Sequence, residues 1–147
     1  MKWICKHFDA LSLEELYQIG RLRQIVFVVE QDCPYIDHDN RDQQSHHFWT
    51  ANSAGLPVAY CRIVPPGISY NEASIGRIIT APEVRKEGYG KVMMTEAIQQ
   101  TLNLYENGAI RISAQCYLEK FYSSFNFEPT GKEYLEDGIP HMEMLRA

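Results

Sequence analysis

The sequence lacks the cysteine spacing and the long apolar run that would each mark a specialised class of protein. Its four cysteines are far apart and form no Cys-x-x-Cys pair, so neither a zinc site nor a redox dithiol is indicated. No apolar stretch approaches the roughly 18 residues of a membrane-spanning helix, and the one near the N-terminus is too short for a signal peptide. We therefore expect idle or buried thiols in a protein of the reducing cytoplasm, with no membrane partner.

The chain has fewer positively charged residues than negatively charged ones. Lys and Arg number 14 against 19 Asp and Glu, which gives a net charge of -5 and a pI near 5.5. Proteins held on phosphate backbones carry the opposite balance, so nucleic acid is not expected as a partner. With 45% hydrophobic residues, the chain can fill one core, and we expect a single domain over residues 1–147. The sequence leaves a homodimer open.

Strands and helices are predicted to alternate along the chain. Short apolar or alternating stretches predict strands near residues 3–8, 47–50, 58–64, 74–80, 110–114 and 142–145. Capping, stop signals and three- to four-residue spacing predict helices over residues 13–30, 89–106 and 118–125. The residues predicted on the inner side of the second helix are Val92, Met93, Ala97, Thr101, Leu104 and Tyr105. This alternation predicts an α/β fold whose sheet is covered by helices on both faces.

The acidic segment of residues 31–45 is too long for a simple connection, so we expect a functional or helix-containing loop. Asp37, Asp39 and Asp42 invite comparison with a calcium-binding loop. However, Asp42 stands where such a loop needs glycine, and Phe48 stands where it needs glutamate. We therefore expect no metal here, but either a plain loop or a surface for a cationic acceptor.

Glycine and positive charge are concentrated in residues 81–91, between a predicted strand and a predicted helix. Gly88 and Gly90 leave room beside the backbone, while Arg85, Lys86 and Lys91 add positive charge. The unpaired amides of a helix N-terminus favour an anion such as phosphate. A plain strand-to-helix turn has the same composition. The spacing is Arg-x-x-Gly-x-Gly, which is neither a dinucleotide fingerprint nor a nucleoside-triphosphate loop.

This spacing resembles the Arg/Gln-x-x-Gly-x-Gly/Ala loop of the GNAT superfamily of acetyl-CoA-dependent N-acyltransferases, which follows a Pro-Glu turn as Pro82-Glu83 does here. Residues 121–127 are similar to the Phe-Tyr-x-x-x-Gly-Phe segment of the family, with Asn126, which tolerates positive φ, in place of glycine. Residues 28–39 and 136–141 are similar to the ElaA-like group. The resemblance covers most of the chain and implies a mixed, mainly antiparallel central sheet with helices on both faces.

The resemblance implies acetyl-CoA as the co-substrate, with no metal. Its pyrophosphate is expected on the backbone amides of the glycine loop, and its pantetheine, which carries amide donors and acceptors, along a strand edge. The residues implied in binding acetyl-CoA are Ile78, Ile79, Thr80, Arg85, Lys86, Glu87, Gly88, Tyr89, Gly90, Lys91 and Gln115. For Arg85, a plain surface cation is the alternative.

Acetyl transfer to an amine needs a polarised thioester carbonyl and a proton for the departing thiolate. A phenol, with a reference pKa of about 10, can protonate a thiolate as it forms. Tyr122 is the predicted general acid, and a core tyrosine is the alternative. A strand N–H near Thr80 would polarise the carbonyl. Cys33 and Cys116 have no context that would activate a nucleophile, so direct transfer is expected.

The general base is left open between Glu30 and His141. A primary amine with a pKa of about 10.4 is mostly protonated at neutral pH, so a carboxylate, an imidazole or ordered water must take its proton. A solvated carboxylate explains Glu30 equally well, and a structural turn histidine explains His141. The residues implied in substrate binding are Glu30, Tyr35, Asp37 and His141.

We therefore expect an enzyme that moves an acetyl group from acetyl-CoA to a primary amine of a small molecule or peptide. A non-catalytic acyl-CoA-binding or sensing module stays open, and Tyr122 favours the enzyme over it. An acyltransferase that uses a longer acyl-CoA or an acyl carrier also stays open, because the sequence does not separate acyl lengths.

Overall fold

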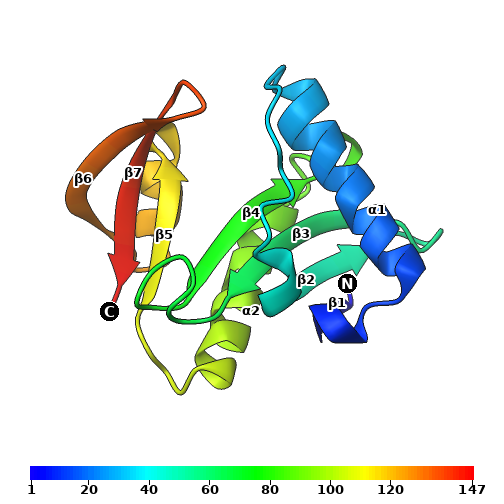
Figure 1. The fold of residues 1–147 in the computed structure, drawn as a ribbon, viewed down its shortest axis with the longest axis horizontal. Coiled ribbons are helices and arrows are strands. Elements are labelled where there is room, and N and C mark those ends of the chain that lie inside the picture. The colour runs from blue at the N-terminus through cyan, green and yellow to red at the C-terminus, as the bar shows by residue number, and fades with distance from the viewer.

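Seven strands and three α-helices make up the fold (Figure 1). The computed structural model describes residues 1–147. The strands are β1 (Trp3–His7), β2 (His46–Ala51), β3 (Pro57–Val64), β4 (Ser74–Thr80), β5 (Ile110–Gln115), β6 (Glu128–Glu136) and β7 (Ile139–Arg146). The α-helices are α1 (Leu13–Arg23), α2 (Tyr89–Leu104) and α3 (Glu119–Ser123). No helix is long and apolar enough to cross a membrane.

The strands form two antiparallel sheets that meet at one point. One sheet has the order β1-β2-β3-β4, and the other has the order β5-β7-β6. A single parallel bridge joins Ala73 to Ile110, next to which the Arg111 amide donates to the Ala73 carbonyl at 2.9 Å. Beyond this bridge β4 and β5 diverge (Figure 1), so the edge of β4 that faces β5 has no strand partner. The expected mainly antiparallel α/β fold is confirmed, although its sheet is divided.

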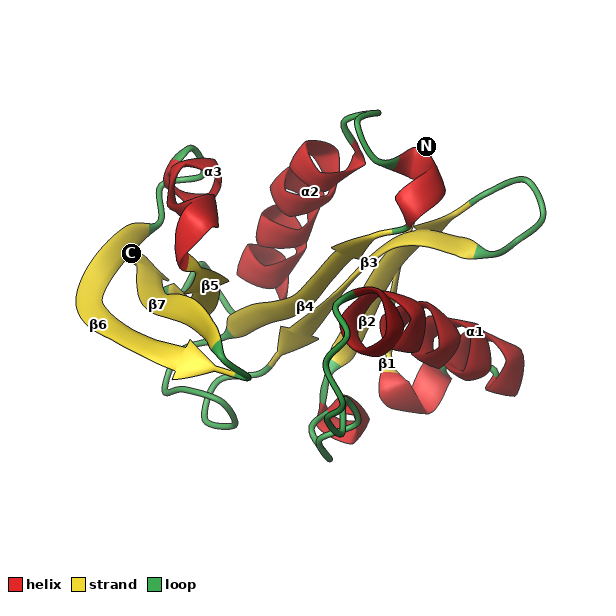
Figure 2. Cartoon of the chain, turned by 90° about the horizontal axis from the view of Figure 1, so that it is seen from above, coloured by secondary structure: helices red, strands yellow, loops and turns green.

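Helices cover both faces of the larger sheet. Figure 2 shows α2 and α3 on one side of the strands and α1 on the other. Strand β3 is buried along its whole length, and its side chains alternate between the two faces. Ala59, Cys61 and Ile63 pack in the cluster on the α2 side, while Val58 and Tyr60 pack in the cluster beneath α1. The core is therefore double, with β3 at its centre.

The first helix begins where the sequence predicts. The Ser12 Oγ accepts from the Glu15 amide at 3.0 Å, and the Glu15 Oε1 accepts from the Ser12 amide at 2.8 Å, which completes the capping box. The helix expected over residues 13–30 is α-helical only as far as Arg23, and a π-helix, η2 (Gln24–Glu30), continues it. Short π-helical stretches often occur at functional sites. Here the stretch brings Phe27 to the wall of a cavity of about 390 Å³.

A bulge in β4 reverses which side chains face each side of the sheet. The pairing of β3 with β4 shifts between Tyr60 and Arg62, so that one residue of β3 faces two of β4. Arg77, in the bulge, has a φ of 51°, in the left-handed region. As a result Ile75 packs on the α2 side and Ile79 beneath α1, although simple alternation would place them on one face.

Three expectations about the elements are wrong. Helix α2 ends at Leu104 rather than at residue 106, and Val92, expected inside, is exposed because Met94 and Ile98 take the inner positions. Strand β6 was not expected, and its side chains are almost all exposed, as on an edge strand that pairs only with β7. Without alternating apolar residues, such a strand has no periodic signal.

Candidate active site

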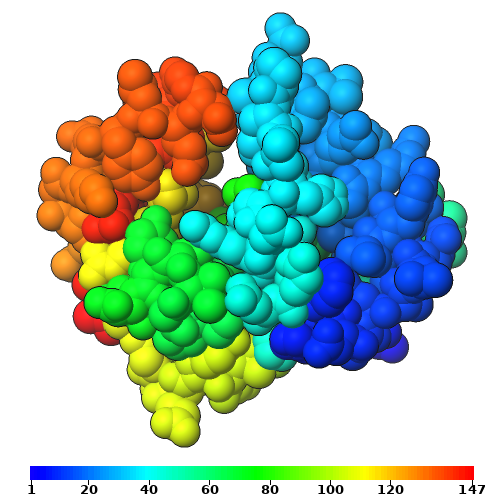
Figure 3. Space-filling model, in the orientation of Figure 1, coloured from blue at the N-terminus to red at the C-terminus, as the bar shows by residue number.

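An open cavity of about 390 Å³ lies where β4 and β5 separate. Figure 3 shows the hollow between the β6–β7 hairpin, the cyan segment of residues 31–45 and the green loop between β3 and β4. The sequence-predicted site residues that line it are Tyr35, Ile78, Gln115, Tyr122 and His141. They come from five different segments of the chain, so the tertiary structure alone brings them together.

Tyr122 of α3 borders the cavity from the core. Its side chain is 5% exposed, and its ring packs edge-on against Phe121 and Phe127, with centroids 5.2 and 6.2 Å away. Burial of the phenol raises the pKa of Tyr122 above its ordinary value, and the nearby Cys61 adds to the rise. No hydrogen bond contributes to that shift. The phenol therefore stays protonated over the neutral range and is available as a proton donor.

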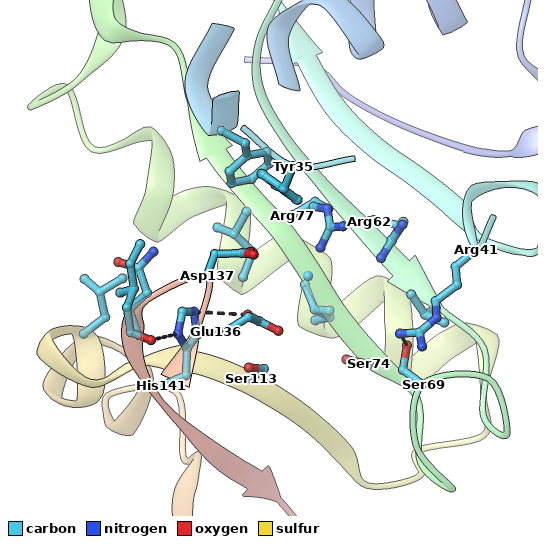
Figure 4. A pocket seen from close by; sticks show the side chains of 18 of the residues that line it. Tyr35, Arg41, Arg62, Ser69, Ser74, Arg77, Ser113, Glu136, Asp137 and His141 are labelled. Atoms are coloured by element: carbon cyan, nitrogen blue, oxygen red, sulfur yellow. Dashed lines mark hydrogen bonds and ion pairs between the residues drawn. The ribbon is translucent and has the colours of Figure 1, made fainter. Parts of the chain in front are cut away.

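The ring of His141, on β7, lies between the Ile139 carbonyl and the Glu136 carboxylate, as Figure 4 shows. The His141 Nδ1 lies 2.7 Å from the Ile139 carbonyl oxygen, and its Nε2 lies 3.2 Å from the Glu136 Oε2. Because Nδ1 must donate to the carbonyl, Nε2 is the nitrogen left to take up a proton. The Glu136 carboxylate would then stabilise the imidazolium. The Ile139 carbonyl thus orients the ring, while the Glu136 carboxylate lies beside the nitrogen that would take the proton. Gln115 lies directly across from His141 in the β5–β7 ladder.

The loop before α2 leaves backbone donors free. Lys86 and Gly88 have φ values of 73° and 81°, and Gly88, as the N-cap residue, offers the helix no side-chain cap. Val92 is the first residue of the helix whose amide reaches a carbonyl, that of Gly88 at 3.3 Å. A methyl group on Gly90 would meet no atom within 4 Å. Unpaired amides beside open space fit a phosphate group, and Tyr89 anchors the loop by packing against both core clusters.

Arg85 and Glu30, which the sequence assigns to different roles, form an ion pair. The Arg85 Nη2 lies 2.6 Å from the Glu30 Oε1, and its Nε donates to the Thr80 carbonyl at 3.3 Å. Neither side chain lines the main cavity. A carboxylate paired with a guanidinium is a poor proton acceptor, because protonation would end the pairing. The geometry therefore favours His141 over Glu30 as a proton acceptor, and the loop amides remain unpaired donors.

Asp37, a predicted substrate residue, lies behind the cavity wall rather than on it. It is 6% exposed and accepts hydrogen bonds from the Nε atoms of Arg23 and Arg77, both at 2.7 Å, and from the Tyr35 hydroxyl at 3.0 Å. These partners occupy both carboxylate oxygens. A part for Asp37 in substrate binding would therefore be indirect, through the positions of Tyr35 and Arg77.

The neighbouring aspartates belong to the same network. Arg62 donates to Asp39 through Nη1 and Nη2 at 2.7 and 2.9 Å and to Asp42 at 2.8 Å, while Arg23 donates to Asp42 at 2.9 Å. Burial alone would raise the pKa of Asp39, but the bonds and charge of Arg62 hold it well below its usual range. Of the two alternatives for this segment, the arginine pairing favours a structural loop over a surface for a cationic acceptor.

Sequence analysis missed the arginines and Glu136. Arg62 and Arg77 line the cavity, as does Glu136, and Figure 4 places both arginines on the wall opposite Glu136 and Asp137. One signal was present, since both arginines stand inside otherwise apolar strand segments. A charge in such a position needs a partner when it is buried.

Comparisons with known proteins agree with this geometry. A family model described as an acetyltransferase (GNAT) domain matches residues 27–146. Protein ElaA of Escherichia coli is 36% identical over 148 residues, covering 99% of this chain and 96% of its own length, and its crystal structure matches with a TM-score of 0.91 over 100% of both chains. A UPF0039 protein of Synechocystis is 38% identical over 145 residues, covering 99% and 94%. The crystal structure of an acyl-CoA N-acyltransferase from Pseudomonas aeruginosa is 37% identical, with a TM-score of 0.94 over 100% of both chains.

Proposed function

Because the chain belongs to the GNAT acetyltransferase family, we propose that it transfers the acetyl group of acetyl-CoA directly to a primary amine of a small molecule or peptide. The similar Pseudomonas protein is described as an acyl-CoA N-acyltransferase, which supports an acyl-CoA co-substrate. In this proposal residues 1–147 act as one catalytic domain. The four free cysteines are in keeping with a cytoplasmic enzyme.

One observation carries the proposal. Tyr122 and the His141–Glu136 pair border the same cavity, beside the stretch of β4 that has no partner strand. A proton donor and a proton acceptor thus face one space into which a thioester and an amine can enter. A module that only bound acyl-CoA would need neither group in the cavity.

The co-substrate would bind along β4 and the N-terminus of α2. Pantetheine carries amide groups, so it can add to the free β4 edge near Ile78 as a short strand would. The pyrophosphate would lie on the unpaired amides of the loop that contains Gly88 and Gly90. Gly88 is exposed and Ile78 is half-buried, and Arg77 of the bulge lines the cavity together with Ile78.

From a neutral amine, the reaction then needs two proton transfers. Once the His141 Nε2 has passed the ammonium proton on to solvent, the neutral amine nitrogen attacks the thioester carbonyl carbon. The proton that this nitrogen then releases passes to the His141 Nε2, directly or through one water molecule. As the C–S bond breaks, the departing sulfur takes the phenolic proton of Tyr122, which gives free CoA and the acetylated amine. A proton returned from His141 to Tyr122 through solvent restores the starting state.

An assay of thiol release from acetyl-CoA with a panel of primary amines tests the proposal. We expect turnover with the wild-type protein and a loss of about 10²-fold or more in kcat for His141→Gln, as for removal of a general base. The matched control is His38→Gln, because His38 is exposed and does not line the cavity.

Two other results are informative. CoA binding without thiol release from any amine would support the acyl-CoA-sensing module instead. Equal turnover of His141→Gln and His38→Gln would remove His141 from the mechanism and reopen the assignment of Glu30.

A further inference from the structure

The two walls of the cavity carry opposite charge. One wall holds Arg41, Arg62 and Arg77, and the other holds the Glu136–His141 pair and Asp137 (Figure 4). Figure 4 also places Arg41 beside Ser69, near the start of β4.

The arginine wall has more positive charge than its own carboxylates neutralise. Four guanidiniums, those of Arg23, Arg41, Arg62 and Arg77, face three carboxylates, so one positive charge is left over. The unpaired guanidinium is that of Arg41, which contacts no carboxylate and donates only to the Ser69 Oγ, at 3.2 Å. The backbone of Arg41 is also fixed, because its amide donates to an aspartate and its carbonyl accepts from a serine. An exposed guanidinium that has no carboxylate partner, on an anchored stretch of backbone, is suited to bind an anion.

The same wall is short of hydrogen-bond acceptors. The Nε of Arg62 is one of two buried polar atoms in the chain that have no partner, and this side chain is 4% exposed. Because this nitrogen has almost no accessible surface, it marks a shortage of acceptors in the wall rather than a direct ligand contact. Arg77, which comes from the bulge, is held in the left-handed conformation, and such backbone strain often occurs at ligand sites.

The wall with Glu136 and Asp137 is suited to bind a positively charged group, as the arginine wall is suited to bind an anion. Glu136 is 54% exposed and Asp137 is exposed, so both can meet an incoming ammonium group. A primary amine arrives protonated at neutral pH, and His141, held by Glu136, is placed to take its proton. The amine thus belongs near His141 and the anion near Arg41.

Resting on the proposed acetyl transfer, we propose that the acceptor is a small bipolar molecule, an aliphatic amine that carries a carboxylate several carbon atoms away. A carboxylate has a single negative charge, which matches the single unpaired guanidinium of Arg41. Arg41 and His141 lie on opposite walls of the cavity, so the two charges of a ligand that meets both must be several bonds apart. An extended ω-amino acid therefore bridges the walls better than glycine does.

The test compares ligands that differ in one group. ε-Aminocaproate carries both charges, n-hexylamine lacks the carboxylate, n-hexanoate lacks the amine, and glycine has both charges too close together. With wild-type protein we expect the kcat/KM for ε-aminocaproate to exceed that for n-hexylamine by about tenfold or more, as for one charged hydrogen-bonded contact. In Arg41→Gln that ratio should fall towards one. The control variant Arg21→Gln removes an exposed arginine of α1 that lies outside the cavity and should keep the ratio.

Binding is measured as well, so that the two proposals can fail separately. In the presence of CoA, ε-aminocaproate should raise the melting temperature more than either n-hexylamine or n-hexanoate does, and Arg41→Gln should abolish the difference. This result without thiol release would keep the bipolar ligand and overturn acetyl transfer. A wild-type protein that prefers n-hexylamine, or an Arg41→Gln variant that behaves as Arg21→Gln does, would overturn the bipolar ligand.

Discussion

Replacing Tyr122 with phenylalanine separates a catalytic role from a packing role, because it removes one hydroxyl group and keeps the ring. The edge-on contacts with Phe121 and Phe127 are retained. No hydrogen bond contributes to the raised pKa of the phenol, so no buried partner is left unsatisfied. We therefore expect the free energy of unfolding to change by less than about 0.5 kcal/mol. For a chain of this size that is a shift of about 2 °C or less in the melting temperature.

Turnover should respond very differently. Loss of a general acid costs about 10² to 10⁴-fold in kcat, which is roughly 3 to 5 kcal/mol in the activation barrier. Burial raises the pKa of Tyr122 above its ordinary value, so the phenol keeps its proton as the pH rises from neutral towards about 10. Deprotonation of Tyr122 should therefore cause no loss of kcat in the wild-type protein over this range.

The assay is thiol release from acetyl-CoA, with the melting temperature measured on the same samples. Tyr117→Phe is the matched control, because Tyr117 is 79% exposed and does not line the cavity. If Tyr122→Phe keeps the kcat of Tyr117→Phe, the phenol is not the acid. A large loss of stability in Tyr122→Phe would show instead that the hydroxyl is a structural group.

Three further predictions concern the co-substrate, the pH dependence and the buried charges. Gly90→Val should abolish the rise in melting temperature that CoA produces, because the valine side chain would fill the space open to phosphate. The control Thr95→Val, at an exposed position on the same helix, should keep the rise. A full rise in Gly90→Val would place the phosphates elsewhere. Burial lowers the pKa of His47, so on acidification the unfolded chain takes up a proton there that the folded chain does not, and the free energy of unfolding should fall as the pH drops below about 6.5. The melting temperature, measured from about pH 7 to 5, should therefore depend less on pH in His47→Asn than in the wild-type protein. An equal pH dependence in the two proteins would contradict this. Arg23→Leu removes the arginine partner of two buried carboxylates, those of Asp37 and Asp42. It should lower the free energy of unfolding, measured with urea, by about 3 to 5 kcal/mol. The control Arg21→Leu, at an exposed position, should change it little, and similar losses in both variants would refute the argument.

Much of the fold can be predicted from the sequence because its signals are local. The Ser12–Glu15 capping box forms as expected, and β4 occupies the residues that the pattern indicates. Asn126 stands where the family has glycine, and it takes a φ of 71°, the conformation that asparagine tolerates. Strand β6 gave no such signal, because an exposed edge strand needs no apolar alternation.

The site is predicted only in part from the sequence. The glycine loop, Tyr122 and His141 belong to short motifs, so contiguous residues are enough to nominate them. Glu136 lies in one of those motifs, yet its contact with His141 depends on the turn of the β6–β7 hairpin. The pairing of Glu30 with Arg85 joins residues 55 positions apart, and nothing near either one in the sequence predicts it.

The sequence by itself therefore determined most of the elements, the family and the glycine loop before α2, because capping, periodicity and glycine spacing act over a few adjacent residues. The tertiary structure decided which charges meet. The bulge at Arg77 changes which side chains face the cavity, and no alternation pattern shows where a strand will bulge. The network that buries Asp37 and leaves Arg41 unpaired depends on distances between separate strands and loops. Burial turns those distances into strong interactions, since a charge out of water must find its partner wherever the fold has placed it.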